Sequence, residues 1–364
     1  QALGERLKAA LTPEEYAQAR RTTQYAHYTS EGVIRSIYDG LRRLGFAGGR
    51  VLEPGMGIGL FKGLMPADMA ASSQYTGVEY DGITGAIAKL LYPQSNVIVG
   101  DYTKTALPRD FFDVAIGNPP FGSIVITNDP EYKKHGFMLH DYFFAKTIDR
   151  VRPGGLLVFV TSKGTMDKAN DRARKYLAER ANLLGAIRLP QTAFKDNAGT
   201  EGVTDVIFLQ KRGPGIEDNG VQTPQGPATI NEYFAAHPEM VLGAHSLTGS
   251  MYRANEYTVV PEPGVDLEQA FARAVANLPE GVYRPGGKNP VAAAAVARER
   301  DFNPTYKKEG GLYVAEDGRL MQVESGVGVE LTHRRGADGK LIALKPNDKA
   351  FLKSWVGLRD ALKQ

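Results

Sequence analysis

The stretch that decides the fold runs from residue 112 to residue 121, and it reads Phe112-Asp113-Val114-Ala115-Ile116-Gly117-Asn118-Pro119-Pro120-Phe121. Its apolar first half predicts a short buried strand, which stops where two prolines prevent further pairing. Proline fixes φ and removes a donor, so the Asn118 amide and the Pro119 carbonyl can both face a ligand as acceptors. An amino group on a planar ring can donate to both while Phe121 stacks on the ring face. The alternative is a proline-rich turn without chemistry, and the neighbouring segments decide between the two.

Apolar strand-like runs alternate with helical patterns from about residue 30 to residue 212. This alternation predicts βαβ units, and therefore an α/β fold whose mostly parallel sheet is covered by helices on both faces. We expect strands at residues 50–53, 75–79, 96–101, 114–116, 156–160, 184–189 and 205–209. We expect helices at residues 30–44, 81–91, 141–152 and 167–179, several of which begin with Ser or Asp as N-caps.

The composition changes after Arg212. Residues 213–227 are polar and rich in Gly and Pro, which indicates a linker or a long loop. We therefore divide the chain into an N-terminal helical extension (1–29), an α/β domain (30–212), and a linker with a small mixed C-terminal region (213–364). Within the last part we expect a hairpin formed by residues 312–314 and 320–323, and a terminal helix over residues 346–363.

Length and composition limit the possible classes of protein. The chain has 364 residues with 42% hydrophobic and 23% charged residues, typical of a globular protein of two domains or of one large domain with an appendage. We find no run of 18 apolar residues and no signal-peptide pattern, and we predict no membrane contact and a cytoplasmic location. Since the chain begins with Gln, we interpret it as a processed chain or a fragment of a longer protein.

Cysteine is absent, and this excludes several chemistries. The chain can form no disulfide, no Cys-based zinc site and no thiolate nucleophile. Methylation at cytosine C5 needs a covalent Cys adduct and is excluded as well. The net charge of +3 permits binding of nucleic acid without arguing for it.

A glycine-rich loop follows the first predicted strand. It reads Glu53-Pro54-Gly55-Met56-Gly57-Ile58-Gly59, and its alternate glycines allow tight turns and close approach of a ligand. Spaced glycines alone are a weak signal, but this loop lacks the Lys-Ser/Thr pair of a phosphate loop. Glu53 would repel a pyrophosphate and favour a cationic ligand, for which S-adenosylmethionine, with its sulfonium and ammonium groups, is suitable.

Two further carboxylates end the next two strands. Glu79 can accept both hydroxyls of a ribose, as acidic residues do at this point of dinucleotide-binding folds. Asp101 can accept from an adenine amino group, with Tyr80 or Tyr102 as a neighbouring ring. Asp81 is a rival of Glu79 but better fits the N-cap of the following helix. Ligands of open α/β sheets bind at the carboxyl ends of strands, so we expect these side chains to share one edge.

These residues, in this order, resemble the N6-adenine DNA methyltransferases of the gamma arrangement, which have a Rossmann-like class I methyltransferase sheet. Tyr28-Thr29 matches the aromatic-Thr pair that precedes the glycine loop in that family and implies contact with the methionine portion of the cofactor. Glu53, Gly55 and Gly57 match the glycine motif, Glu79 the ribose motif, Asp101 the adenine motif, and Asn118, Pro119, Pro120 and Phe121 the catalytic tetrad. Phe121 stands where the family more often has Tyr, which keeps the stacking and loses a hydroxyl.

The resemblance also implies roles for two downstream rings. Phe143 matches an aromatic residue that packs on the cofactor adenine, and Phe194 falls where the family has a second ring for the target base. For both, ordinary packing in the core is the alternative. The resemblance implies S-adenosylmethionine as the cofactor, no metal, and methyl transfer to adenine N6 in DNA after the base leaves the stack.

Other readings and partners remain open in the sequence. The Asn-Pro-Pro-aromatic motif also occurs in enzymes that methylate protein glutamine amides or amino groups of RNA bases, and a methylase fold can serve as a catalytically silent nucleic-acid-binding module. Residues 230–364 resemble the methylase portion of phage or plasmid methylase–helicase polypeptides, which implies a fused or associated helicase or specificity module and a role in restriction-modification. Basic residues that can contact DNA phosphates, with a solvated helix face as the alternative, are Lys133, Lys134, Lys163, Lys168, Arg172, Arg174 and Lys175.

Overall fold

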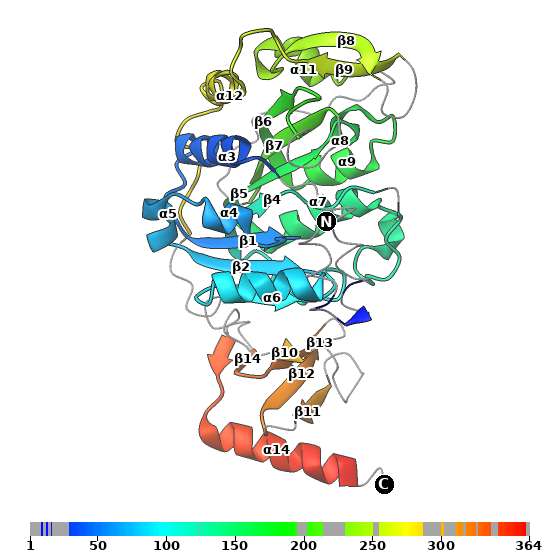
Figure 1. Cartoon of the computed structure of the whole chain (residues 1–364). Helices are drawn as coiled ribbons and strands as arrows, with labels where there is room; N and C mark the ends of the chain where they lie inside the picture. Colours follow the sequence, from blue (N-terminus) through cyan, green and yellow to red (C-terminus); the bar gives the residue numbers. More distant parts are fainter. Residues whose placement is uncertain are drawn as a thin grey trace. The chain divides into compact units, whose positions relative to one another are not determined.

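A computed structural model describes most of the chain, and its elements are labelled in Figure 1. The described residues are 29–122, 124–194, 202–213, 230–249, 255–286, 300–301, 311–315, 318–324, 327–335 and 341–361, with residues 9, 12, 13 and 16. The chain forms two compact units: residues 1–102 with 109–286, and residues 103–108 with 287–364. In the described part, no helix is long and apolar enough to cross a membrane.

The first unit is built on a seven-stranded sheet with the strand order β3-β2-β1-β4-β5-β7-β6 (Figure 1). The strands are β1 (Arg50–Pro54), β2 (Gln74–Glu79), β3 (Asn96–Val99), β4 (Phe112–Gly117), β5 (Val151–Ser162), β6 (Ala181–Leu189) and β7 (Thr204–Lys211). Five neighbouring strands run parallel, and β7 lies antiparallel to both β5 and β6. The predicted α/β fold with a mostly parallel sheet is confirmed.

Helices cover both faces of this sheet. On one face, α3 (Glu31–Arg43) and α12 (Leu267–Val275) bury Ile37 and Phe271 in a core with alternate strand residues such as Val158. On the other face lies α7 (Leu139–Arg150), where Phe144 packs edge-on against Phe159, the strand neighbour of Val158. Successive residues of a strand point to opposite faces, so one central strand supplies both cores.

The first unit has further helices among its described residues. They are α4 (Leu60–Gly63), α5 (Ala67–Ala71), α6 (Gly82–Leu91), α8 (Gly164–Asp167), α9 (Arg172–Ala178) and α11 (Glu232–Ala236), with the 3₁₀ turns η1 (Lys133–His135) and η2 (Pro238–Met240). Asp81 caps α6 by accepting a hydrogen bond from the Thr84 amide at 2.7 Å, as predicted. The helix predicted over residues 167–179 is wrong at its start, because Lys168 is extended and separates α8 from α9.

The predicted domain boundary at residue 212 falls inside the first unit, which continues to Gly286. Phe271 and Leu278 belong to the main core, and the Gln210 side chain donates to the Val282 carbonyl at 2.7 Å. A hairpin of β8 (Ala244–Gly249) and β9 (Glu256–Val260) also belongs to this unit. Residue 212 marks a change of composition, but not the end of the compact unit. Of the predicted linker, residues 214–227 lie outside the described residues.

The second unit contains a four-stranded antiparallel sheet and a helix. The sheet has the order β10-β13-β12-β11, and β14 pairs with β15. The elements are β10 (Arg300–Asp301), β11 (Leu312–Val314), β12 (Leu320–Glu324), β13 (Val327–Glu330), β14 (His333–Arg335), β15 (Leu341–Ala343) and α14 (Pro346–Ala361). The predicted hairpin is the antiparallel pair of β11 and β12, and the predicted terminal helix is α14.

Candidate active site

The predicted tetrad begins where β4 ends, at the carboxyl edge of the sheet. The strand is fully buried up to Gly117, and its register aligns Ala115 with Leu52 of β1, so Asn118 emerges beside the loop that follows β1. The Asn118 Nδ2 atom donates to Thr29 Oγ1 at 3.2 Å, and Thr29 is itself buried. This bond sets the orientation of the amide and joins the tetrad to the segment before α3.

The glycine loop and the tetrad lie against each other. Gly55, Gly57 and Gly59 have φ values of 74°, 57° and 86°, the left-handed region that glycine adopts without strain. A methyl group placed on Gly55 would lie 3.4 Å from Pro120 Cδ and 3.9 Å from Phe143 Cε1. Three motifs that are distant in the sequence therefore meet at one edge of the sheet: the glycine loop, the tetrad and the ring from α7.

Glu53 is buried at the end of β1 and is held by a tyrosine. Tyr75 donates its hydroxyl to Glu53 Oε2 at 2.6 Å. Burial raises the pKa of Glu53 well above its ordinary value, the Tyr75 hydrogen bond opposes the rise, and the nearby Glu79 charge adds to it. A cationic ligand at this edge would favour the ionised form of Glu53.

The Glu79 side chain is hydrogen-bonded to the backbone of the glycine loop. Its two carboxylate oxygens accept from the Gly57 and Asp81 backbone amides, each at 2.8 Å. Burial raises the pKa of Glu79, and these backbone hydrogen bonds oppose the rise. Each carboxylate oxygen has a second lone pair, so Glu79 can also accept hydrogen bonds from hydroxyl groups of a ligand. Among the described residues, no atom beyond the two sequence neighbours of Gly57 lies within 4 Å of a methyl group placed on it, so there is space for a ligand beside the loop.

Asp101 follows β3 and is half-buried. The Gly100 amide donates to the Glu79 carbonyl at 2.8 Å, which keeps this strand end beside that of β2. Of the two tyrosines proposed as ring neighbours, Tyr80 is 76% exposed, whereas Tyr102 is buried. The Tyr102 ring stacks on Phe143 with centroids 4.8 Å apart, so it lies beneath Phe143 in the core.

The other aromatic residues predicted at the site lie in different surroundings. Phe143 is buried in α7 but approaches Gly55, which keeps it at the candidate cofactor site. Phe194 is buried in the main hydrophobic core, and this favours the packing alternative over contact with a target base. Phe121 is half-buried at the edge. Tyr28 lies outside the described residues.

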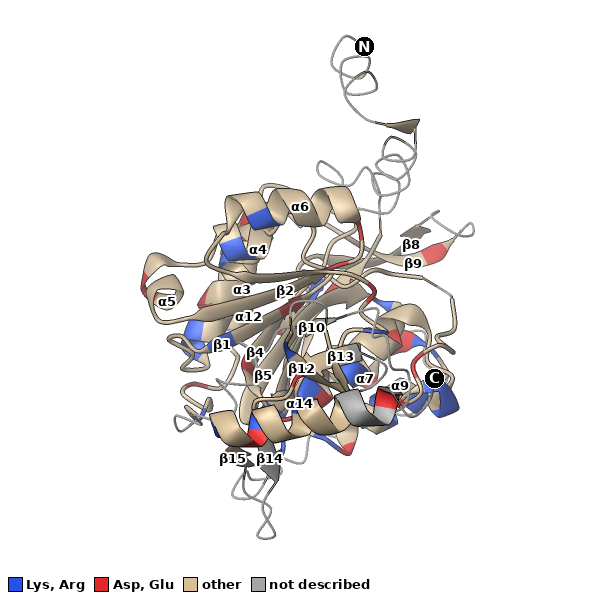
Figure 2. Ribbon diagram, turned by 90° about the horizontal axis from the view of Figure 1, so that it is seen from below, with Lys and Arg blue, Asp and Glu red and all other residues tan. Residues whose placement is uncertain are grey.

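The basic residues expected near the edge divide into two groups. Lys163 pairs with Glu256, Lys168 pairs with Asp141, and Arg174 is buried and donates to backbone carbonyls. The exposed members are Lys133, Lys134, Arg172 and Lys175. An open groove of about 470 Å³ is lined by His135, Arg172, Lys175 and Arg180, among others. Figure 2 shows Lys and Arg segments on α9, which forms one side of this groove.

A buried polar network on α7 was not anticipated from the sequence. Asp129, in the loop after the tetrad, accepts from Lys146 Nζ at 3.0 Å and from the Tyr142 hydroxyl at 2.6 Å. In a sequence Asp129 looks like an ordinary loop residue before Pro130, and only the presence of charged residues on an otherwise apolar helix hinted at a partner. Among the described residues, no three His, Asp or Glu side chains gather as a metal site.

The residues fit S-adenosylmethionine in position and in chemistry. The glycine loop leaves open space at Gly57, and Glu79 lies beside it. Glu53 would become ionised when a cation binds, and Asp101 provides an acceptor on the neighbouring strand end. A sulfonium and an ammonium group suit an acidic edge, while a pyrophosphate does not.

Comparison with known proteins agrees with this assignment. Residues 95–194 match the family described as Eco57I restriction-modification methylase. The Defense against restriction protein B of Escherichia phage P1 is 30% identical over 190 residues, which are 51% of this chain and 8% of that protein. The chain thus spans less than a tenth of the length of this curated relative.

Two solved structures have weaker similarity. A proposed class I S-adenosylmethionine-dependent methyltransferase from Listeria monocytogenes is 17% identical, with 55% of this chain and 66% of that chain covered and a TM-score of 0.47. The methyltransferase subunit of a type I restriction-modification system from Streptococcus thermophilus is 20% identical, with 51% and 45% covered and a TM-score of 0.43.

The sheet is Rossmann-like and mostly parallel, with the antiparallel β7 between β5 and β6. The match over residues 95–194, which includes the tetrad, confirms the resemblance to restriction-modification methylases.

Proposed function

We propose that this protein transfers the methyl group of S-adenosylmethionine to the N6 amino group of adenine in DNA. The observation that carries the proposal is the position of Asn118-Pro119-Pro120-Phe121 at the carboxyl end of β4, in contact with the glycine loop at Gly55. Two acceptors and a flat ring at this position suit an amino group on a planar base.

The tetrad would act by holding the target base. The Asn118 side-chain oxygen and the Pro119 carbonyl accept the two amino hydrogens, and Phe121 stacks on the base. Bound S-adenosylmethionine supplies an electrophilic methyl group on sulfur. In the transfer a nitrogen–carbon bond forms as the sulfur–carbon bond breaks, and the surplus proton leaves to solvent. Positioning of this kind can contribute about 7–11 kcal/mol to catalysis.

Three carboxylates would hold the cofactor in this proposal. Glu79 accepts the ribose hydroxyls, Asp101 accepts from the adenine amino group, and Glu53 provides negative charge for the methionine portion. Thr29, hydrogen-bonded to Asn118, would lie between this portion and the tetrad. Phe143 would pack on the adenine, supported from below by Tyr102.

DNA is the substrate that the surroundings of the tetrad favour. The loop that follows the tetrad bears exposed Lys133 and Lys134. The groove lined by His135 has Arg172 and Lys175 on its wall together with Asp171 and Glu179, and Lys175 pairs with Asp171 at 3.0 Å. Phosphate contacts of this kind would position a duplex or single strand while the target base enters the site. A fused or associated helicase or specificity module and a cytoplasmic location remain predictions.

Transfer of tritium from labelled S-adenosylmethionine tests the proposal. The protein is incubated separately with duplex DNA, single-stranded DNA, RNA and protein acceptors, and methylated nucleosides are identified after digestion. We expect label in N6-methyladenine from DNA, and Asn118→Ala should abolish it while cofactor affinity stays within a few fold. Asp101→Ala should instead weaken cofactor binding. Label found only in RNA or protein would show that DNA is not the substrate. Full activity of Asn118→Ala would refute the role of the tetrad.

A further inference from the structure

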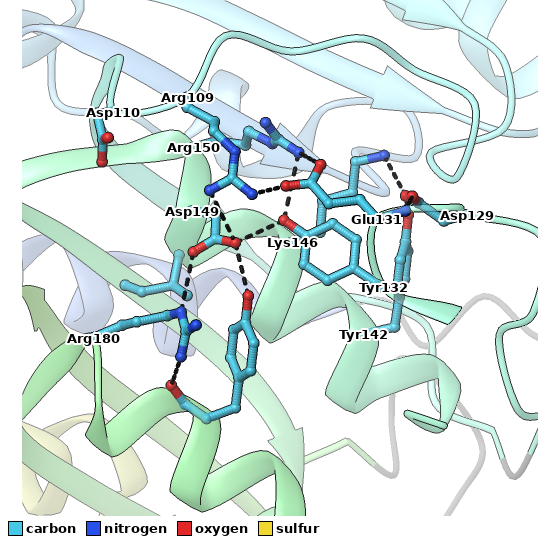
Figure 3. A network of polar contacts seen from close by, with 12 residues as sticks. Arg109, Asp110, Asp129, Glu131, Tyr132, Tyr142, Lys146, Asp149, Arg150 and Arg180 are labelled. Carbon is cyan, nitrogen blue, oxygen red and sulfur yellow. Dashed lines mark hydrogen bonds and ion pairs between the residues drawn. The ribbon is translucent and has the colours of Figure 1, made fainter. Parts of the chain in front are cut away.

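The loop that follows the tetrad, described here over residues 124–138, is held mainly by buried charged groups. Its two ends are joined where the Ile126 amide donates to the Phe137 carbonyl at 2.9 Å. Between them, Asp129 is only 5% exposed, and its carboxylate accepts from Tyr142 and Lys146 of α7 and from the Glu131 amide. Figure 3 shows these groups converging on the loop from α7.

A second set of contacts holds the same loop further along. Tyr132 donates its hydroxyl to Asp149 Oδ2 at 2.8 Å, and Arg150 Nη2 donates to Glu131 Oε2 at 2.6 Å. Arg109 also pairs with Glu131 (Figure 3). The loop therefore has a defined position relative to α7, although it contains little regular structure.

Lys146 connects this network to the end of β3, where Asp101 lies. Its Nζ atom donates to Asp129 Oδ2 at 3.0 Å and to the Tyr102 carbonyl at 2.7 Å. Tyr102 directly follows Asp101, the carboxylate assigned to the cofactor adenine. One ammonium group thus joins the strand end that would bind adenine to the loop that leads away from the tetrad.

Because Lys146 is buried, its ammonium group depends on the acceptors Asp129 and the Tyr102 carbonyl. The Lys146 side chain is 3% exposed, and burial lowers its pKa to about 8, while the Asp129 charge opposes the fall. A buried ammonium is stable only with its acceptors in place, so a shift of either the strand end or the loop affects the other.

We propose that Lys146 is a positioning residue that couples cofactor binding at Asp101 to the order of loop 124–138, and so prepares the site for the target base. The inference rests on the proposed function for the identity of the base. The coupling itself requires only that the cofactor binds at the β3 end. Since Lys146 touches neither reacting group, its effect passes through Tyr102 and Asp129.

Hydrogen exchange measured by mass spectrometry tests the coupling without any DNA. S-adenosylhomocysteine is the probe, because it occupies the cofactor site without turnover. In the wild-type protein we expect it to slow exchange of peptides within 124–138 about tenfold, within the range typical of coupled sites. Lys146→Met should lose this protection while binding S-adenosylhomocysteine within a few fold of wild type. Asp129→Asn, which keeps the shape of the side chain, should have the same effect and serves if Lys146→Met does not fold.

A second hydrogen-bonded lysine provides the matched control. Lys163 Nζ donates to Glu256 Oε1 at 2.8 Å and to the Tyr257 carbonyl at 2.6 Å, and neither partner belongs to the network around Asp129. Lys163→Met should therefore keep the loop protection. An equal loss in this variant, no protection in the wild type, or retained protection in Lys146→Met would each overturn the coupling. Protection without methylation of DNA would overturn the proposed substrate and leave the coupling standing.

Discussion

Replacing Gly57 by alanine should change cofactor affinity and folding stability by amounts that can be measured separately. Gly57 has a φ of 57°, and in the described part of the chain no atom beyond its two sequence neighbours lies within 4 Å of a methyl group placed there. The alanine must adopt a left-handed backbone conformation, which destabilises the fold by about 1–2 kcal/mol, and its methyl group clashes with no described part of the protein. If the cofactor fills the open space, the same methyl group meets the ligand instead.

The expected loss of affinity follows from the size of that collision. Forcing a methyl group into an occupied, well-packed space costs about 1–3 kcal/mol, and each 1.4 kcal/mol is a tenfold change in the dissociation constant. Isothermal titration calorimetry with S-adenosylhomocysteine should therefore show binding weaker by about 5-fold to 150-fold. Urea unfolding of the same sample measures the backbone term separately.

Gly264 provides the control for backbone strain. It has a φ of 76° and equally open surroundings among the described residues, and it lies in the turn between β9 and α12, outside the motifs assigned to the cofactor. Gly264→Ala should lose a similar amount of stability and keep wild-type affinity for the cofactor. If Gly57→Ala binds S-adenosylhomocysteine as tightly as Gly264→Ala does, the cofactor does not lie beside the glycine loop as we have argued.

Two further predictions concern buried charges. Because burial raises the pKa of Glu53, a cationic ligand that lowers it again should release protons on binding. Calorimetry of S-adenosylmethionine, which carries the sulfonium charge, in buffers of different ionisation enthalpy should detect this release, and Glu53→Gln should remove it. Asp205→Ala should lower the free energy of unfolding in urea by about 3–5 kcal/mol, because it removes one partner of the fully buried Arg188–Asp205 pair. The exposed Arg35 pairs with Glu31 at 3.5 Å, and Arg35→Ala should leave unfolding nearly unchanged; an equal loss in both variants would contradict the argument from burial.

The sequence predicted the sheet well because its strands are apolar runs with clear ends. The tetrad, Glu53, Glu79 and Asp101 were placed together correctly, since parallel strands bring their carboxyl ends to one edge. Whether these residues act as assigned stays a prediction. Asp81 was also interpreted correctly as a cap, because capping depends on local chemistry alone.

What the sequence could not show depends on contacts between distant segments. Phe194 matched a family position, but an isolated aromatic residue does not reveal whether it faces a ligand or the core. Nothing near residue 212 indicates that α12 returns to pack on α3. The partnership of Asp129 with Lys146 links a loop to a helix and leaves no periodic pattern. Such pairings become visible only when the chain is folded.

The antiparallel β7 has a consequence for the order in which the protein can assemble as it is made. Strand β6 emerges before β7 but pairs only with β7 in the sheet, and β7 alone joins it to β5. Residues 50–162 can build five strands on their own, whereas the edge of β5 stays open until residue 211 has been synthesised. Domains fold from their N-terminal part during translation, so a pause in this interval would leave a long apolar edge exposed to other nascent chains.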